Sequence, residues 1–320
     1  MLCAVNRAAL ARAAIAVTRV VVLVVVLGAA VGLAGLVHVG VGRYVHPVRT
    51  VPAQTPDMLG LAYQNVTLHT SDGLDLAAWY LPGSRSEALI LLHGIGSNRA
   101  DALPLASRIH TRGYSLLLPD LRAHGQSGGD TCTLGVKEVE DIRAALEFLQ
   151  SQPGIDPGRV GIWGVSLGAA TALQAAAQLP DLHAVAADSA FSSARWLVQH
   201  QLGSLVALPD WFGPALLAVG GWEAGVSPDA IAPVDAMPRI APRPVLLIQG
   251  DQDALFAPEN ARLLLDAARG PADLWEIPHA GHGGVYALDP DAYVTRLDRF
   301  FTQALATESG LAGRASVAEL

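Results

Sequence analysis

Cysteine is scarce in this chain: Cys3 and Cys132 are the only thiols among its 320 residues. Two thiols are too few for a disulfide scaffold or a zinc cluster. Charged residues make up 16% of the chain and apolar residues 51%, a balance that excludes a chain kept disordered by its charge. Acidic residues outnumber basic ones, 29 to 21, so the formal net charge is −8 and no nucleic-acid partner is expected.

Sequence motifs for metals and cofactors are also missing. The chain has no H-E-x-x-H, no paired C-x-x-C, no P-loop and no dinucleotide fingerprint with its downstream acid. We therefore expect neither a metal ion nor an organic cofactor, and no protein partner is predicted. The length fits one large α/β domain with a short extra segment.

A long uncharged run stands near the N-terminus. Val20–Val37 contains eighteen residues without a charge or a proline, and the apolar stretch continues through His38 to Gly42. About twenty helical residues span the hydrocarbon core of a bilayer. The alternative is a cleaved secretory signal, but its apolar region is shorter, roughly 7–15 residues, and ends at a small-x-small site that is missing here. Residues 20–42 are therefore predicted to be a single-pass anchor in the lipid bilayer.

The charges beside this run indicate its orientation. Three arginines precede it and two follow it, so residues 1–19 are predicted to be cytoplasmic and the rest of the chain extracytoplasmic. Residues 43–60 contain three prolines and little periodicity, which predicts a semi-extended linker that lifts the soluble domain off the membrane.

Beyond residue 60, strand and helix patterns alternate, and alternation of this kind predicts an α/β fold with a mostly parallel sheet flanked by helices. The domain is predicted over 61–305, with a small helical cap at about 190–240 and a flexible tail at 306–320. The expected strands are Tyr63–Thr70, Leu74–Leu81, Ala88–Leu92, Ser115–Leu118, Arg159–Trp163, Leu182–Ala187, Val245–Gln249 and Asp273–Ile277, and the expected helices are Ala100–Thr111, Val136–Gln150, Leu167–Gln178, Pro258–Ala268 and Pro290–Leu305.

One serine follows a buried strand and opens an alanine-rich helix. Ser166 is flanked by Gly164 and Gly168, and this G-x-S-x-G spacing allows a very tight strand-to-helix turn. The turn pushes the hydroxyl out at the end of the sheet, beside a helix N-terminus that favours developing negative charge. A serine needs a base to become a good nucleophile, and the base needs an acid that orients it.

Both kinds of partner follow later strands. The turn Gly250–Asp253 carries two carboxylates, and the loop Pro278–Gly283 carries His279 and His282. Asp188, at the end of another strand, is a further acid. All these side chains come just past strand ends, at the edge where ligands bind in open α/β sheets.

These motifs, together with His93–Asn98 (HGIGSN) and Asp120–Ser127 (DLRAHGQS), resemble the α/β-hydrolase superfamily over about residues 61–305. The chain is similar in particular to the bacterial membrane-anchored branch labelled serine aminopeptidase-like or prolyl-oligopeptidase-like, whose relatives include esterases, lipases and thioesterases. One departure is Ala123, where relatives usually have glycine.

The resemblance implies Ser166 as nucleophile, His282 as base and Asp253 as acid. Asp253 fits the G-x-x-D spacing of relatives better than Asp251, which is expected to cap the turn, or Asp188, which is expected to bond to Ser189. His282 lies beside glycines as in relatives, and His279 does not. The resemblance further implies that the backbone N–H groups of Ile95 and Leu167 form an oxyanion hole, and that His93 and Gly94 support its loop.

The cap segment carries several large aromatic residues. We expect an apolar substrate wall from Trp196, Trp211, Phe212 and Trp222. The predicted function is hydrolysis of a carboxylic ester or thioester through an acyl-enzyme, with a small-molecule acyl substrate. One alternative is a serine peptidase for small peptides, with Glu223, Asp229 and Asp235 as a site for the substrate amine. The other, from a different class, is a catalytically inactive membrane-anchored binding protein.

Overall fold

Eight strands form one sheet in the order β1-β2-β4-β3-β5-β6-β7-β8 in the computed structural model, which describes residues 7–205 and 210–306. Strands β3 to β8 run parallel to one another, whereas β2 pairs antiparallel with both β1 and β4. The strands are β1 (Gln64–His69), β2 (Asp75–Leu81), β3 (Ala88–Leu92), β4 (Ser115–Pro119), β5 (Val160–Val165), β6 (Ala184–Asp188), β7 (Val245–Gly250) and β8 (Ala272–Ile277).

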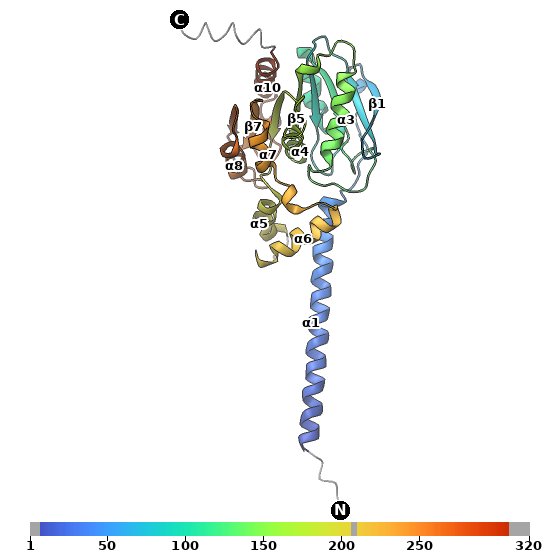
Figure 1. Ribbon diagram of the computed structural model, residues 1–320, viewed down its shortest axis with the longest axis vertical. Helices are drawn as coiled ribbons and strands as arrows, with labels where there is room; N and C mark the ends of the chain where they lie inside the picture. Colours follow the sequence, from blue (N-terminus) through green and yellow to red (C-terminus); the bar gives the residue numbers. More distant parts are fainter. Residues whose placement is uncertain (1–6, 206–209, 307–320) are drawn as a thin grey trace, which may run out of the picture.

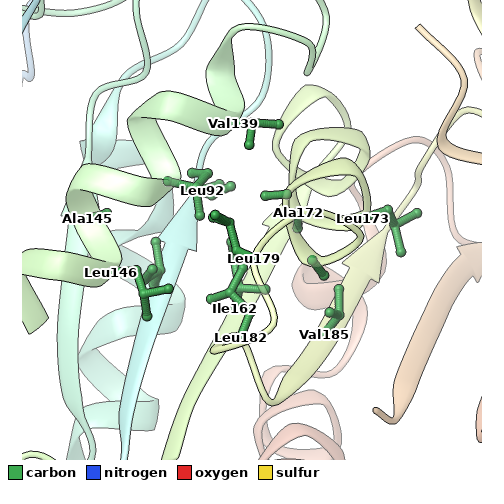
Figure 2. Close-up of a cluster of buried hydrophobic side chains, with 14 of the residues drawn as sticks. Leu92, Val139, Ala145, Leu146, Ile162, Ala172, Leu173, Leu179, Leu182 and Val185 are labelled. Atoms are coloured by element: carbon green, nitrogen blue, oxygen red, sulfur yellow. The ribbon is translucent and has the colours of Figure 1, made fainter. Parts of the chain in front are cut away.

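Helices cover both faces of the sheet. One face packs against α3, α4, α7 and α8 and the other against α2, α9 and α10. Figure 2 shows the first interface, where Leu92 and Ile162 of the sheet meet Leu146 of α3 and Ala172 of α4. The helices are α1 (Arg7–Val45), α2 (Leu103–Ile109), α3 (Glu138–Gln150), α4 (Leu167–Ala176), α5 (Ala194–Leu205), α6 (Gly213–Ala224), α7 (Pro233–Ile240), α8 (Glu259–Ala267), α9 (Val285–Leu288) and α10 (Pro290–Ala304).

The predicted fold class is confirmed, and the sequence pattern explains why. Every residue of β3, β4 and β6 is buried because helices cover both faces of the sheet, and such strands read as continuous apolar runs. The predicted bounds of β3 are the observed ones. The short helix α9 was not predicted, since four residues carry too little periodicity to be recognised.

The first helix is much longer than the predicted span. α1 runs from Arg7 to Val45 and stands out from the domain as a single rod (Figure 1). It is apolar and almost entirely exposed, and by length and composition it is able to cross a bilayer, as a signal sequence near an N-terminus also is. Residues 1–6 of the predicted cytoplasmic segment and 307–320 of the predicted tail lie outside the described residues.

The structure corrects the start of the linker predicted over 43–60, because its first three residues belong to α1. The helix continues to Val45, whose carbonyl accepts a hydrogen bond of 2.7 Å from the Cys132 N–H. His46 bonds through Nδ1 to the Asp130 carbonyl at 2.7 Å. Backbone groups at a helix end need partners, and the loop before α3 supplies them. The start of the segment is therefore bound to the domain.

The predicted cap over about 190–240 divides into two parts. Helices α5 and α6 lie at the end of the domain that α1 joins (Figure 1). Helix α7 packs instead on α4 and α8, within the layer that covers the sheet. The cap proper thus consists of α5 and α6, and α6 packs directly against α1.

Candidate active site

Ser166 occupies the turn between β5 and α4 with φ 56° and ψ −114°, a positive-φ conformation that costs free energy for a residue with a side chain. The two glycines of the motif permit the turn because they have no side chain, so neighbouring backbone can approach them closely. A Cβ on Gly164 would lie 2.3 Å from the carbonyl carbon of Gly168, and a Cβ on Gly168 would lie 2.7 Å from the His93 carbonyl oxygen. The tight packing holds the strained serine at the carboxyl end of the sheet.

Gly164→Ala is therefore expected to destabilise the fold. The new methyl group meets backbone atoms that cannot move aside, so we expect a loss of about 3 kcal/mol or more in the free energy of unfolding, seen as a lower Tm in thermal unfolding. Gly158→Ala is the matched control, because its Cβ would lie 3.4 Å from the nearest atom, an Asp156 carboxylate oxygen. Equal Tm values for the two variants would contradict the explanation.

Three side chains from distant parts of the chain meet at this edge. His282 Nε2 lies 2.9 Å from Ser166 Oγ, and His282 Nδ1 lies 2.8 Å from Asp253 Oδ2. Ser166 is 8% exposed and Asp253 3%. Ser166 follows β5, Asp253 follows β7 and His282 follows β8, so parallel strands carry all three to one edge. A hydroxyl, an imidazole and a carboxylate in this order form the arrangement that activates a serine for attack on a carbonyl.

Asp253 is held by several donors. Its Oδ1 accepts hydrogen bonds from the N–H groups of Leu255 and Phe256 at 2.9 and 2.8 Å, and its Oδ2 accepts one from the Gln249 amide at 3.1 Å. Burial alone would raise the pKa of Asp253, but hydrogen bonds from His282 and the Phe256 N–H lower it below the ordinary value. The carboxylate therefore stays ionised and fixed behind the imidazole.

The competing candidates have other partners. Asp251 was expected to cap its own turn, and it accepts a hydrogen bond of 2.6 Å from the His279 N–H in the loop after β8. The His279 ring bonds to the Gln252 amide at 3.2 Å. Asp188 accepts a hydrogen bond from the Ser189 hydroxyl at 2.9 Å, as expected.

Asp188 belongs to a buried polar network behind the imidazole. Its Oδ2 accepts a hydrogen bond of 2.7 Å from the Tyr293 hydroxyl, which in turn accepts one of 2.9 Å from the Trp163 indole. Ser189 accepts from the Gly283 N–H at 3.2 Å, next to His282. Burial raises the pKa of Asp188 to about 6, against the lowering effect of the bonds from Tyr293 and Ser189.

This raised pKa makes stability depend on pH. Between pH 3.8 and about 6 the folded protein keeps a proton on Asp188 that the unfolded chain has released. The free energy of unfolding is therefore expected to fall as the pH rises through this window, by up to about 3 kcal/mol. Thermal unfolding of the wild type and of Asp188→Asn across this pH range tests the expected fall. The variant has no carboxyl group at this position, so its stability lacks this pH dependence. Parallel Tm curves for the two proteins would refute it.

The residues predicted for the oxyanion hole surround Ser166. Ile95 and Leu167 line the pocket beside it, and neither N–H has a hydrogen-bond acceptor within residues 7–205 and 210–306. A Cβ on Gly94 would lie 3.6 Å from Ser166 Cβ, so this loop passes directly over the serine. Two free N–H groups next to a serine hydroxyl are suited to hold a negatively charged oxygen.

His93 connects this loop to the neighbouring one. The ring is fully buried, bonds through Nδ1 to the Gly94 carbonyl at 2.7 Å, and accepts the Leu121 N–H on Nε2 at 3.1 Å. Burial, with a smaller contribution from His124, lowers the pKa of His93 to about 3, so the ring is neutral and acts as a brace. Ala123 in the neighbouring loop adopts φ 62°, which explains why glycine is usual in relatives at this position.

An apolar pocket of about 510 Å³ opens beside Ser166, a volume typical of small-molecule sites. It is lined by α1, α5, α6, the loop before α3 and the region of Phe256. The contribution of α1 was not predicted. Hydropathy marks the helix as a membrane segment and carries no signal that its end contacts the domain.

The four aromatic residues predicted as a substrate wall do not line this pocket, and the prediction is corrected. Trp211 and Trp222 are 71% and 80% exposed, Phe212 packs between α1 and α6, and Trp196 lines a separate pocket. Helical periodicity explains the result for α6. One face of the helix lines the pocket and Trp222 falls on the opposite face, so aliphatic residues and glycines form the wall.

Among the described residues, no group of three or more His, Cys, Asp or Glu side chains is arranged to hold a metal ion.

Comparison with known proteins finds relatives over most of this chain. An uncharacterised protein of Mycobacterium tuberculosis is 31% identical over 245 residues, covering 76% of this chain and 80% of that protein. The Arabidopsis thaliana α/β-hydrolase domain-containing protein WAV2 is 27% identical over 251 residues, covering 75% of this chain and 78% of its own. The chain belongs to the α/β-hydrolase superfamily. Within it, residues 80–223 match the family of X-Pro dipeptidyl-peptidases (S15).

A solved structure of the same superfamily indicates the kind of chemistry. The esterase Pf2001 of Pyrococcus furiosus superposes on this α/β-hydrolase with a TM-score of 0.71 and 26% identity, covering 82% of this chain and 99% of that one. These similarities make the protein a hydrolytic enzyme of the serine-hydrolase type.

Proposed function

We propose that this enzyme hydrolyses carboxylic esters or thioesters through Ser166, His282 and Asp253. The observation that carries the proposal is the continuous pair of contacts, 2.9 Å from Ser166 Oγ to His282 Nε2 and 2.8 Å from His282 Nδ1 to Asp253 Oδ2. The apolar pocket beside the serine supports an acyl substrate.

The reaction follows from these positions. His282 takes the proton of Ser166 as Oγ attacks the carbonyl carbon, and Asp253 stabilises the imidazolium. The N–H groups of Ile95 and Leu167 hold the oxyanion. His282 then gives its proton to the leaving alcohol or thiol, which leaves an acyl group on Ser166. Water, deprotonated by His282, releases the acid and restores the serine.

We further propose that α1 is retained as a single-pass anchor in the bilayer through residues 20–42, with the catalytic domain outside the cytoplasm. The length of the apolar run supports a span, and the excess of arginines before it supports this orientation. The attachment of Val45 to the Cys132 N–H makes the helix end part of the domain.

A peptidase of small peptides is the second candidate, favoured by the match to the X-Pro dipeptidyl-peptidase family. The acidic residues that were considered as a binding site for the substrate amine do not support a peptidase. Glu223 is paired with His38 and Asp229 with Arg195, and Asp235 is exposed. Of the described residues that line the pocket, none is acidic, so no carboxylate faces a bound amine there.

The full-length protein in detergent tests the proposal. A fluorophosphonate probe is expected to label Ser166, and a panel of acyl esters and thioesters is expected to be hydrolysed far faster than aminoacyl and dipeptidyl amides. Faster turnover of the amides would favour the peptidase. Neither labelling nor turnover would favour a catalytically inactive binding protein.

A further inference from the structure

The end of α1 forms one wall of the pocket beside Ser166. Leu36, Val39, Gly40 and Val41 lie within the predicted membrane span, and they line the same pocket as Ser166 itself. A pocket wall made from a membrane helix brings the cavity to the level of the lipid. It is an unusual use of an anchor, because a tether alone needs no contact with a substrate site.

Helix α6 forms the opposing wall and is packed on α1. Val37 of α1 and Leu216 of α6 are buried against each other, 6% exposed each. A polar contact fixes the pair: His38 Nδ1 lies 2.5 Å from Glu223 Oε1, and the Glu223 side chain is only 4% exposed. Glu223 is the only charged residue of α6, and its one described partner lies on the membrane helix. The cap is therefore fastened to the anchor.

The outer surface of the cap suits a membrane interface. Trp222 on α6 and Trp211 just before it are 80% and 71% exposed, on a segment with almost no charge. Exposed tryptophans are costly in water but are enriched where a protein meets the headgroups and the outer acyl chains. Leu36 and Val39 of α1, on the same end of the molecule, are also largely exposed. Figure 1 shows α6 beside the upper part of the rod.

We propose that the substrate is an ester or thioester of a membrane lipid, whose acyl chain passes directly from the bilayer between α1 and α6 to Ser166. This inference rests on the proposed hydrolase function and on α1 as the anchor. Water is the only co-reactant: the bond between the carbonyl carbon and the leaving oxygen or sulfur breaks, and a free fatty acid and the lipid's alcohol or thiol are released.

The two walls supply a direct test. A Cβ on Gly220 of α6 would lie 3.5 Å from Val41 Cγ1, so a small side chain fits there and a longer one enters the space between the helices. Gly220→Leu is expected to lower the ratio of kcat/KM for palmitoyl to acetyl nitrophenyl ester about tenfold. Ala218→Leu, the same kind of enlargement on the exposed face of α6, is the matched control and is expected to keep the wild-type ratio.

These assays use the full chain in phospholipid nanodiscs, with fluorophosphonate labelling of Ser166 as a measure of intact protein. A Gly220→Leu protein that labels normally and keeps the wild-type ratio would overturn the inference, as would a wild type that prefers acetyl esters. A wild type that hydrolyses no ester and takes no label would instead overturn the proposed hydrolase function.

A second pair of variants is independent of packing inside the pocket. Trp211→Ala and Trp222→Ala are expected to slow hydrolysis of a palmitoyl ester embedded in phosphatidylcholine vesicles about tenfold. The same variants are expected to hydrolyse water-soluble butyryl ester as the wild type does, because neither tryptophan lines the pocket. Unchanged rates on the vesicles would contradict entry from the membrane at this face.

Discussion

Replacing Ser166 with alanine is expected to lower kcat for ester hydrolysis by about 10⁶-fold, to the level that the oxyanion donors and binding supply alone. In the proposed reaction the hydroxyl forms the acyl-enzyme, since its Oγ contacts His282 Nε2 at 2.9 Å. Steady-state hydrolysis of a nitrophenyl ester by the detergent-solubilised full chain measures the effect.

The alanine variant is also expected to fold normally and to lose fluorophosphonate labelling completely. Ser166 sits at φ 56°, a conformation that alanine adopts at a cost similar to that of serine, so the turn is retained. An unchanged Tm is the control for folding. Ester turnover within a factor of about ten of the wild type would show that Ser166 is not the nucleophile.

Asp253→Asn is expected to lower kcat by about 10⁴-fold while leaving the Tm within a few degrees of the wild type. The amide has nearly the same shape as the carboxylate, but it cannot stabilise the imidazolium and it favours the wrong tautomer of His282. Part of the donor set that fixes Asp253, the N–H groups of Leu255 and Phe256, is still able to hold the new side chain.

Asp188→Asn supplies the matched comparison, because Asp188 is also a buried acid that follows a strand end at this edge. Its carboxyl bonds to Ser189 and Tyr293, not to His282. The Asp188 variant is therefore expected to keep kcat within about tenfold of the wild type. A larger loss of kcat in Asp188→Asn than in Asp253→Asn would instead identify Asp188 as the acid that orients His282.

The sequence indicated the sheet and the positions of the reactive side chains because both follow from local pattern. Buried parallel strands appear as short apolar runs, and the residue after each run comes to the same edge of the sheet. The structure places His282 in contact with both Ser166 and Asp253, and it gives Asp251 and His279 other partners. The choice between these neighbours depended on similarity to relatives, since spacing alone left them open.

The pocket could not be predicted in the same way. Which helix face turns inward depends on contacts between segments far apart in the chain, such as Val37 with Leu216. The aromatic residues of the cap were expected to form a substrate wall because ligand pockets are mostly lined by apolar and aromatic side chains, but Trp211 and Trp222 are exposed. The 43–60 segment was expected to be a semi-extended linker because its prolines indicate irregular structure, and prolines do not show which part of the domain such a segment contacts.

The uninterrupted passage of α1 into the domain has a mechanical consequence. From Gly42, the end of the predicted span, to Val45, where the Cys132 N–H is bound, the helix rises only about 5 Å. With α1 in a bilayer, no flexible linker separates the catalytic domain from the membrane helix. The height and tilt of the domain above the membrane therefore follow those of α1. Molecules that dissolve in the surrounding leaflet reach it by lateral diffusion, so its catalytic rate would depend on their surface density more than on their bulk concentration.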